Sequence, residues 1–126
     1  MKRRHAWLFS LILLGALPTG CSVGQVSAPS VPSGPYQVVK VTASDWKWTL
    51  SSNHLKYGEP VKFVMTSIQG THGFSIVGTN VSNAVTVGGK PQVVYWNPPA
   101  KGTYTIACNV YCGAGHSSMV TAFMVS

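Results

Sequence analysis

Two cysteines, one histidine and one methionine fall within twelve residues near the C-terminus, and no other stretch is so dense in reactive side chains. The segment reads CNVYCGAGHSSM and contains Cys108, Cys112, His116 and Met119. Thiolate and thioether sulfurs favour copper in its lower oxidation state, and imidazole suits copper in either state. Zinc gains nothing from a thioether, and iron–sulfur clusters usually take four thiolates. The donor set therefore predicts a redox copper site.

The spacing of these donors distinguishes between kinds of copper site. A mononuclear blue-copper site uses one cysteine, two histidines and a weak axial methionine, so a second cysteine in the same loop is one thiolate too many. Two thiolates can instead bridge two copper ions. The loop, with the pattern CxxxCxxxHxxM, resembles the ligand loop of the binuclear CuA centre in cytochrome c oxidase subunit II and nitrous oxide reductase.

This resemblance implies a role for each donor of the loop. The family loop supplies two bridging thiolates, which would be Cys108 and Cys112 here. It also supplies a terminal imidazole and a weak thioether, which would be His116 and Met119. A weak backbone carbonyl ligand would be that of Val110. The implied cofactor is a pair of copper ions.

A second terminal histidine of the family comes from an upstream strand. His72 lies in the segment THGFSI, 36 residues before Cys108, and this segment resembles that strand. His54, in the segment SSNHL, has polar turn residues around it and is interpreted as an ordinary loop histidine. Because two cysteines in an exported protein more often form a disulfide, a disulfide-stapled binding module without metal stays open as the weakest alternative.

Charged residues are scarce in this chain of 126 residues, whose length allows one domain with a real core. Nine lysines and arginines face only Asp45 and Glu59, and all charged residues together make up 9% of the chain. After position 20 there are six lysines, no arginine and two acids, a net charge of +4 without a basic run. Nucleic-acid binding needs clustered basic residues, so the composition argues against such a partner.

Residues 1–20 have the organisation of an export signal, with a positive start and an apolar run from Trp7 to Leu17. This run is shorter than the roughly 20 residues that span a bilayer. The sequence LPTGC resembles the end of a bacterial lipoprotein signal, with Pro18 as a departure from the pattern, and implies an acylated Cys21 at the outer face of the cell membrane. Residues 21–34 are small, polar and rich in proline, which predicts a flexible tether.

Residues 35–126 are expected to form one all-β domain. Short runs rich in β-branched and aromatic residues alternate with clusters of turn residues, and no long stretch has a helical period. The expected strands cover residues 36–42, 45–50, 60–66, 72–77, 84–87, 92–96, 103–107 and 119–125. Seven or eight such strands predict a Greek-key β-sandwich, and a copper site between loops at one end is typical of a cupredoxin.

Two tryptophans in the sequence DWKW are further functional candidates. Strand alternation is expected to place Trp46 and Trp48 on one face and Lys47 on the other. In subunit II, an aromatic cluster in this neighbourhood receives the electron from cytochrome c, so the resemblance implies that one of these rings could do the same. Packing in the core is the alternative for both rings.

The resemblance covers about residues 36–126 and implies an extracytoplasmic domain that passes single electrons, without bond chemistry of its own. The donor would be a cytochrome c or another small redox protein, and the acceptor a terminal oxidase or related respiratory enzyme. A copper-trafficking protein that delivers copper to an oxidase is the alternative. Mitochondrial-type subunits steer a basic cytochrome c with an acidic patch, which two acids cannot provide. The donor is therefore expected to dock by apolar contact, to be acidic, or to be tethered to the same membrane.

Overall fold

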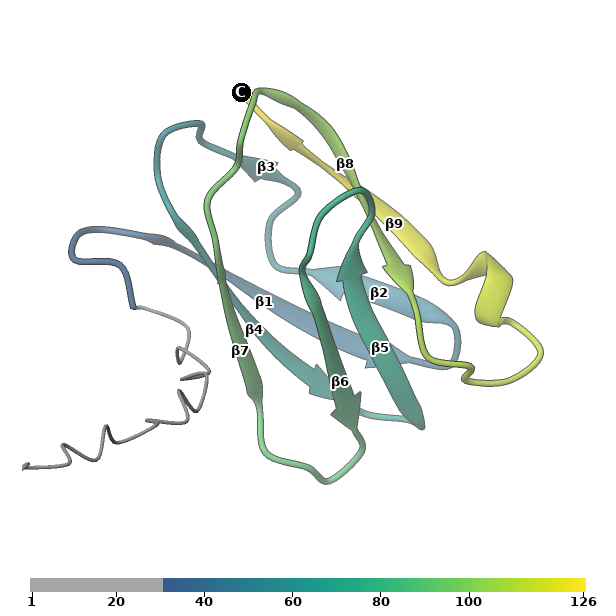
Figure 1. Cartoon of the computed structure of the whole chain (residues 1–126). Helices are drawn as coiled ribbons and strands as arrows, with labels where there is room; N and C mark the ends of the chain where they lie inside the picture. Colours follow the sequence, from purple (N-terminus) through teal and green to yellow (C-terminus); the bar gives the residue numbers. More distant parts are fainter. Residues whose placement is uncertain (1–30) are drawn as a thin grey trace, which may run out of the picture.

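Two β-sheets packed face to face make up the computed structural model, which describes residues 31–126 (Figure 1). The first sheet has four strands in the order β2 (Lys47–Leu50), β1 (Gln37–Ser44), β4 (Val61–Ser67) and β7 (Gln92–Trp96). The second has five strands in the order β3 (His54–Leu55), β9 (Val120–Val125), β8 (Gly102–Cys108), β5 (Thr71–Ile76) and β6 (Ser82–Thr86). A short 3-10 helix, η1 (His116–Ser118), precedes β9.

Each sheet contains both parallel and antiparallel pairs, and most neighbouring strands are not consecutive in sequence. β1 pairs with β4 in parallel, and β3 pairs with β9 in parallel, whereas the other pairs are antiparallel. The chain therefore crosses between the sheets repeatedly, and segments far apart in sequence meet at the ends of the sandwich.

The core lies between the sheets and follows the alternation of side chains along each strand. In β4, the residues Val61, Phe63 and Met65 are fully buried, while the residues between them are half-buried on the outer face. The second sheet contributes buried side chains to the same cluster, among them Phe74, Ile106 and Phe123. Because both sheets bury one face against the other, the predicted all-β sandwich is confirmed.

The boundaries of all eight expected strands agree with the structure to within two residues. The structure adds one strand that was not expected, and one expected strand begins later. His54 belongs to β3, a two-residue strand that pairs with Met124 and Val125 of β9, and not to a loop. β2 begins at Lys47, because Asp45 and Trp46 form the turn after β1.

This turn also separates the two tryptophans that were expected to share a strand face. Trp46 has a positive φ of 73°, which breaks the strand alternation, and its exposed fraction is 41%. Trp48 lies within β2 and is 3% exposed. One ring is therefore at the surface and the other is in the core.

The expected export signal, the candidate lipidation residue Cys21 and tether residues 21–30 lie outside the described residues. Residues 31–36 lead into β1 without forming a helix or strand. Within residues 31–126, no helix is long and apolar enough to cross a bilayer.

Candidate metal centre

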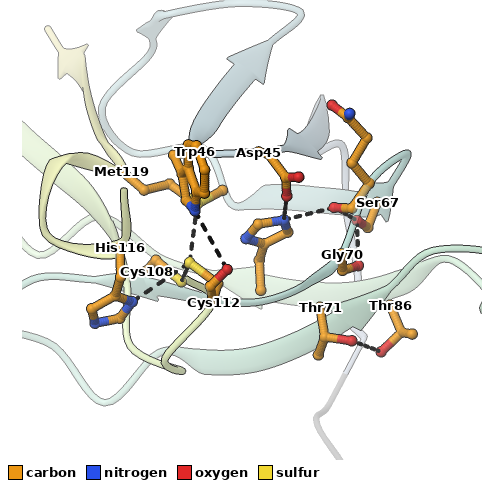
Figure 2. A network of polar contacts seen from close by, with 12 residues as sticks. Asp45, Trp46, Ser67, Gly70, Thr71, Thr86, Cys108, Cys112, His116 and Met119 are labelled. Carbon is orange, nitrogen blue, oxygen red and sulfur yellow. Dashed lines mark hydrogen bonds and ion pairs between the residues drawn. The ribbon is translucent and has the colours of Figure 1, made fainter. Parts of the chain in front are cut away.

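The connection between β8 and β9 carries the four side-chain donors of the predicted ligand loop, as Figure 2 shows. Cys108 is the last residue of β8, Cys112 lies in the loop that follows, His116 begins η1, and Met119 lies between η1 and β9. A short strand-to-helix connection therefore turns all four side chains toward one end of the sandwich.

His72 reaches the same place from β5. This strand pairs with β8 in antiparallel register, with Phe74 opposite Cys108. Two residues before Phe74, His72 therefore lies beside the first residues of the loop. One nitrogen of His72 and the two cysteine sulfurs all lie within 4.8 Å of one another.

The two sulfurs form the centre of the group. The Sγ atoms of Cys108 and Cys112 are 3.4 Å apart, and both residues are free cysteines. The Cys108 thiol lies 3.0 Å from the carbonyl oxygen of Val110. Cys112 Sγ lies 3.6 Å from His116 Nδ1 and 3.9 Å from Met119 Sδ. The structure thus brings together every donor that the sequence predicted.

The buried imidazole of His72 is oriented by hydrogen bonding at one nitrogen only. Its ring is fully buried, and Nε2 lies 2.7 Å from the carbonyl oxygen of Gln69, which can only accept, so Nε2 carries the proton. Nδ1 then presents a lone pair, and it has no hydrogen-bond partner. A buried polar atom without a partner is unfavourable unless another group uses it, and a metal ion would do so.

The chemistry of the donor set fits copper. Two thiols, a thioether and two imidazoles are soft or intermediate ligands, and copper is the ion that accepts all three kinds. Burial, and after it the neighbouring Cys108 thiol, raise the pKa of the Cys112 thiol to about 11, with a smaller contribution from the charge of Asp45. The metal-free site therefore keeps a proton on Cys112 at neutral pH, and a bound metal must displace it.

Gly73 allows the ligand loop to pack directly on β5. Its N–H donates to Cys108 Sγ at 3.4 Å, and its carbonyl accepts from the N–H of Asn109 at 3.0 Å. A Cβ at this position would overlap Asn109 Oδ1 and would lie 2.7 Å from the backbone nitrogen of Val110. The position of the first sulfur therefore depends on the absence of a side chain at residue 73.

Trp46 covers the second half of the loop, where Figure 2 shows its ring above Cys112. Its Nε1–H donates to the carbonyl oxygen of Cys112 at 3.4 Å. A Cβ at Gly115 would overlap the indole, and one at Gly113 would lie 3.2 Å from its Nε1. A bulky residue with positive φ is unusual and persists only where the surroundings hold it, which these contacts do.

Trp48 supports the site from inside. Its ring meets the His72 ring at a centroid distance of 6.1 Å and the Phe74 ring at 5.7 Å, both edge to face. The contact with Trp48 restricts the His72 ring from the side of β2.

Sequence reasoning did not single out four residues that shape the site, namely Asp45, Gln69, Gly73 and Gly115. Gly73 and Gly115 each stand beside a ligand in the sequence, so their position was a usable signal. Gln69 acts through its backbone carbonyl, which any residue carries, and no sequence signal could have found it.

An all-β sandwich with a cluster of sulfur and imidazole donors at one end defines a cupredoxin-type domain. Comparison with solved structures agrees with this class. The periplasmic domain of cytochrome oxidase subunit II of Bradyrhizobium japonicum has a TM-score of 0.65 at 15% identity, over 71% of this chain and 83% of that one. Auracyanin B has a TM-score of 0.56 at 17% identity, over 76% and 93%.

No family model matches the chain. Cytochrome c oxidase subunit 2 of Thermus thermophilus is 33% identical over 96 residues, which cover 75% of this chain and 70% of that protein. A second subunit 2 sequence from the same organism has the same identity over 96 residues and is covered to 56%. The chain therefore belongs to the cytochrome c oxidase subunit II family.

Proposed function

We propose that the domain holds a binuclear CuA centre and passes single electrons from a small redox protein to the catalytic part of a terminal oxidase or a related respiratory enzyme. The observation that carries this proposal is the pair of free thiols 3.4 Å apart, which one nitrogen of His72 joins within 4.8 Å. Nδ1 of the same ring has no hydrogen-bond partner. In this proposal Cys108 and Cys112 would supply the two thiolates that the copper ions share. The remaining ligands would be His72, His116, Met119 and the carbonyl oxygen of Val110.

The bound copper pair would supply one-electron redox chemistry, with the change in charge shared between two ions. The chain's own residues keep the ligands in place for this. Gly73 N–H directs a hydrogen bond at Cys108 Sγ, and Gln69 fixes the ring of His72. Met119 is fully buried, so it excludes water from its side of the centre. Ligands held by paired strands and hydrogen bonds need to move little when an electron arrives or leaves.

Of the two candidate tryptophans, Trp46 is the one whose position supports electron uptake. Its ring is partly exposed to solvent and contacts the ligand loop at Cys112. Trp48 is instead buried in the core, against the ring of His72. The same end of the sandwich exposes apolar side chains of the loop and its flanks: Val110 at 39%, Tyr111 at 80% and Val120 at 54%. A donor that docks by apolar contact would meet this surface and bring its redox group close to Trp46.

The proposed organisation of the whole chain keeps this domain outside the cytoplasm. Residues 1–20 would act as an export signal, acylated Cys21 would anchor the chain to the membrane, and residues 21–34 would connect the anchor to the domain at 35–126. An extended tether of this kind spans about 3 Å per residue. The domain could therefore reach a membrane-bound oxidase.

The test is copper loading of the full chain under reducing conditions. We expect two copper ions per chain, a purple absorption and an electron paramagnetic resonance signal split by two equivalent copper nuclei. Cys112→Ser should abolish that signal, and Cys21→Ser, which removes the third cysteine of the chain, should retain it. Uptake of one copper ion per chain would contradict the proposal. Rapid loss of copper to an acceptor apoprotein would instead indicate copper trafficking.

A further inference from the structure

His72 Nε2 has a second polar neighbour besides the carbonyl oxygen of Gln69. Asp45 Oδ1 lies 3.6 Å from His72 Nε2, the same nitrogen that lies 2.7 Å from the Gln69 carbonyl oxygen. The imidazole is fully buried, whereas the carboxylate is 43% exposed. The proton on Nε2 therefore faces two oxygen atoms, and one of them belongs to a charged group.

The local backbone makes this approach possible. Asp45 stands in the tight turn between β1 and β2, in which the N–H of Trp46 donates to the carbonyl oxygen of Ser44 at 2.8 Å. On the opposite side, Gly70 has a φ of +70° and no side chain. A Cβ at Gly70 would lie 3.0 Å from Asp45 Oδ1 and 3.1 Å from His72 Nε2. A side chain there would crowd the gap between the carboxylate and the ring.

Asp45 is one of two acids in a chain of otherwise positive charge. The other, Glu59, pairs with Lys56 at 3.8 Å. Within residues 31–126, the group that Asp45 pairs with is His72, and no lysine lies within 4.0 Å of its carboxylate. The negative charge is thus directed at the ring that the proposed function makes a copper ligand.

We propose that Asp45 is a positioning residue that acts on the copper centre through His72. With the Gln69 carbonyl it holds the proton on Nε2, so that Nδ1 keeps an unprotonated lone pair for the copper centre. Its charge makes the imidazole a stronger donor and favours the more positive, oxidised state of the centre over the reduced one. The inference rests on the proposed copper site and adds a determinant of its reduction potential.

The test compares Asp45→Asn with Glu59→Gln in the full chain, since each removes one negative charge and leaves the side chain's size nearly unchanged. In the copper-loaded protein, we expect Asp45→Asn to shift the equilibrium between oxidised and reduced forms about threefold to tenfold toward the reduced form. For a one-electron couple this is a rise of about 30 to 60 mV in reduction potential. Glu59→Gln should leave the reduction potential within the error of the wild type. Asp45→Glu, which keeps the negative charge, should have a potential close to that of the wild type.

A second readout needs no copper. In nuclear magnetic resonance spectra of the metal-free protein, the Nε2 proton of His72 should exchange with solvent at least threefold faster in Asp45→Asn than in the wild type or in Glu59→Gln. A variant Asp45→Ser, which also removes the charge, should reproduce both effects. Since Asp45 is partly exposed, these variants are expected to fold, which thermal unfolding of the metal-free proteins checks.

The outcomes separate this inference from the function on which it rests. If the wild-type chain does not bind two copper ions, the proposed function fails before any variant is compared. If the wild type shows the two-copper signal and Asp45→Asn has the same potential and the same proton exchange as Glu59→Gln, the function stands and the role of Asp45 is refuted.

Discussion

Replacing Gly73 by alanine is expected to move the ligand loop while leaving every proposed ligand in the chain. Gly73 does not have a positive φ, so the backbone itself accepts alanine. The added Cβ would overlap Asn109 Oδ1 and would approach Val110 N and Cγ2 to 2.7 Å. The amide oxygen can rotate away, but the backbone of Val110 can move only with the loop.

The size of the effect follows from these contacts. Overpacking of a filled site costs about 1 to 3 kcal/mol. The hydrogen bond from Asn109 N–H to Gly73 would stretch, and a hydrogen bond of this kind contributes about 0.5 to 1.5 kcal/mol. We therefore expect the free energy of unfolding of the metal-free protein to fall by about 2 to 4 kcal/mol. For a domain of this size, that corresponds to a loss of at least about 8 °C in Tm.

Copper binding should change as well, because Gly73 N–H also contacts Cys108 Sγ. Calorimetric unfolding and the copper content per chain are measured on Gly73→Ala and on Gly34→Ala, whose added Cβ would meet nothing within 4 Å. The control should differ from the wild type by less than about 0.5 kcal/mol. If Gly73→Ala were as stable as the control and bound copper fully, the close packing of the loop on β5 would not position the ligands as argued.

Three further predictions concern the same site. In Gly115→Ala, the added Cβ would overlap the Trp46 ring and should displace it. Electron uptake from a donor, measured by stopped-flow, should become at least about tenfold slower while the copper content stays unchanged. An unaltered rate would exclude this ring from the electron-transfer route. The pKa of the Cys112 thiol is raised to about 11, so copper must displace a proton when it binds. The apparent copper affinity, measured by competition with a chelator, should therefore rise at least about tenfold from pH 6 to pH 8. A pH-independent affinity would contradict thiolate ligation. His72→Ala should abolish the two-copper signal, whereas His54→Ala, which alters an exposed histidine on β3, should preserve it; equal loss in both would indicate a general folding defect.

Much of the site could be predicted because its donors are close in sequence. Four side-chain donors stand between the end of β8 and the start of β9. Their residue types predicted copper, and the resemblance of their spacing to a known ligand loop implied the binuclear centre. His72 was found through a resemblance between segments, not through any local rule. Its proximity to the sulfurs depends on the antiparallel register of β5 and β8, which the printed sequence does not contain.

The expectations that failed concern positions where tertiary contacts outweigh local pattern. Alternation placed Trp46 and Trp48 on one strand face, but the turn at Asp45 and the contact of the indole with Gly115 hold Trp46 outside the strand. His54 has loop-like neighbours and still becomes part of β3, because the carbonyls of Asn53 and Leu55 on either side of it accept hydrogen bonds from the N–H groups of Met124 and Ser126. In both cases the deciding partner is more than sixty residues away.

The sequence by itself determined the identity of the donors, the all-β class and the near absence of acidic charge, since these depend on residue types and on spacings of a few positions. Only the tertiary structure decided which nitrogen of His72 is free, which tryptophan is exposed, and that Asp45 faces the ring of His72. These features depend on which strands become neighbours and in what register, and side-chain geometry of this kind exists only after the two sheets have packed together.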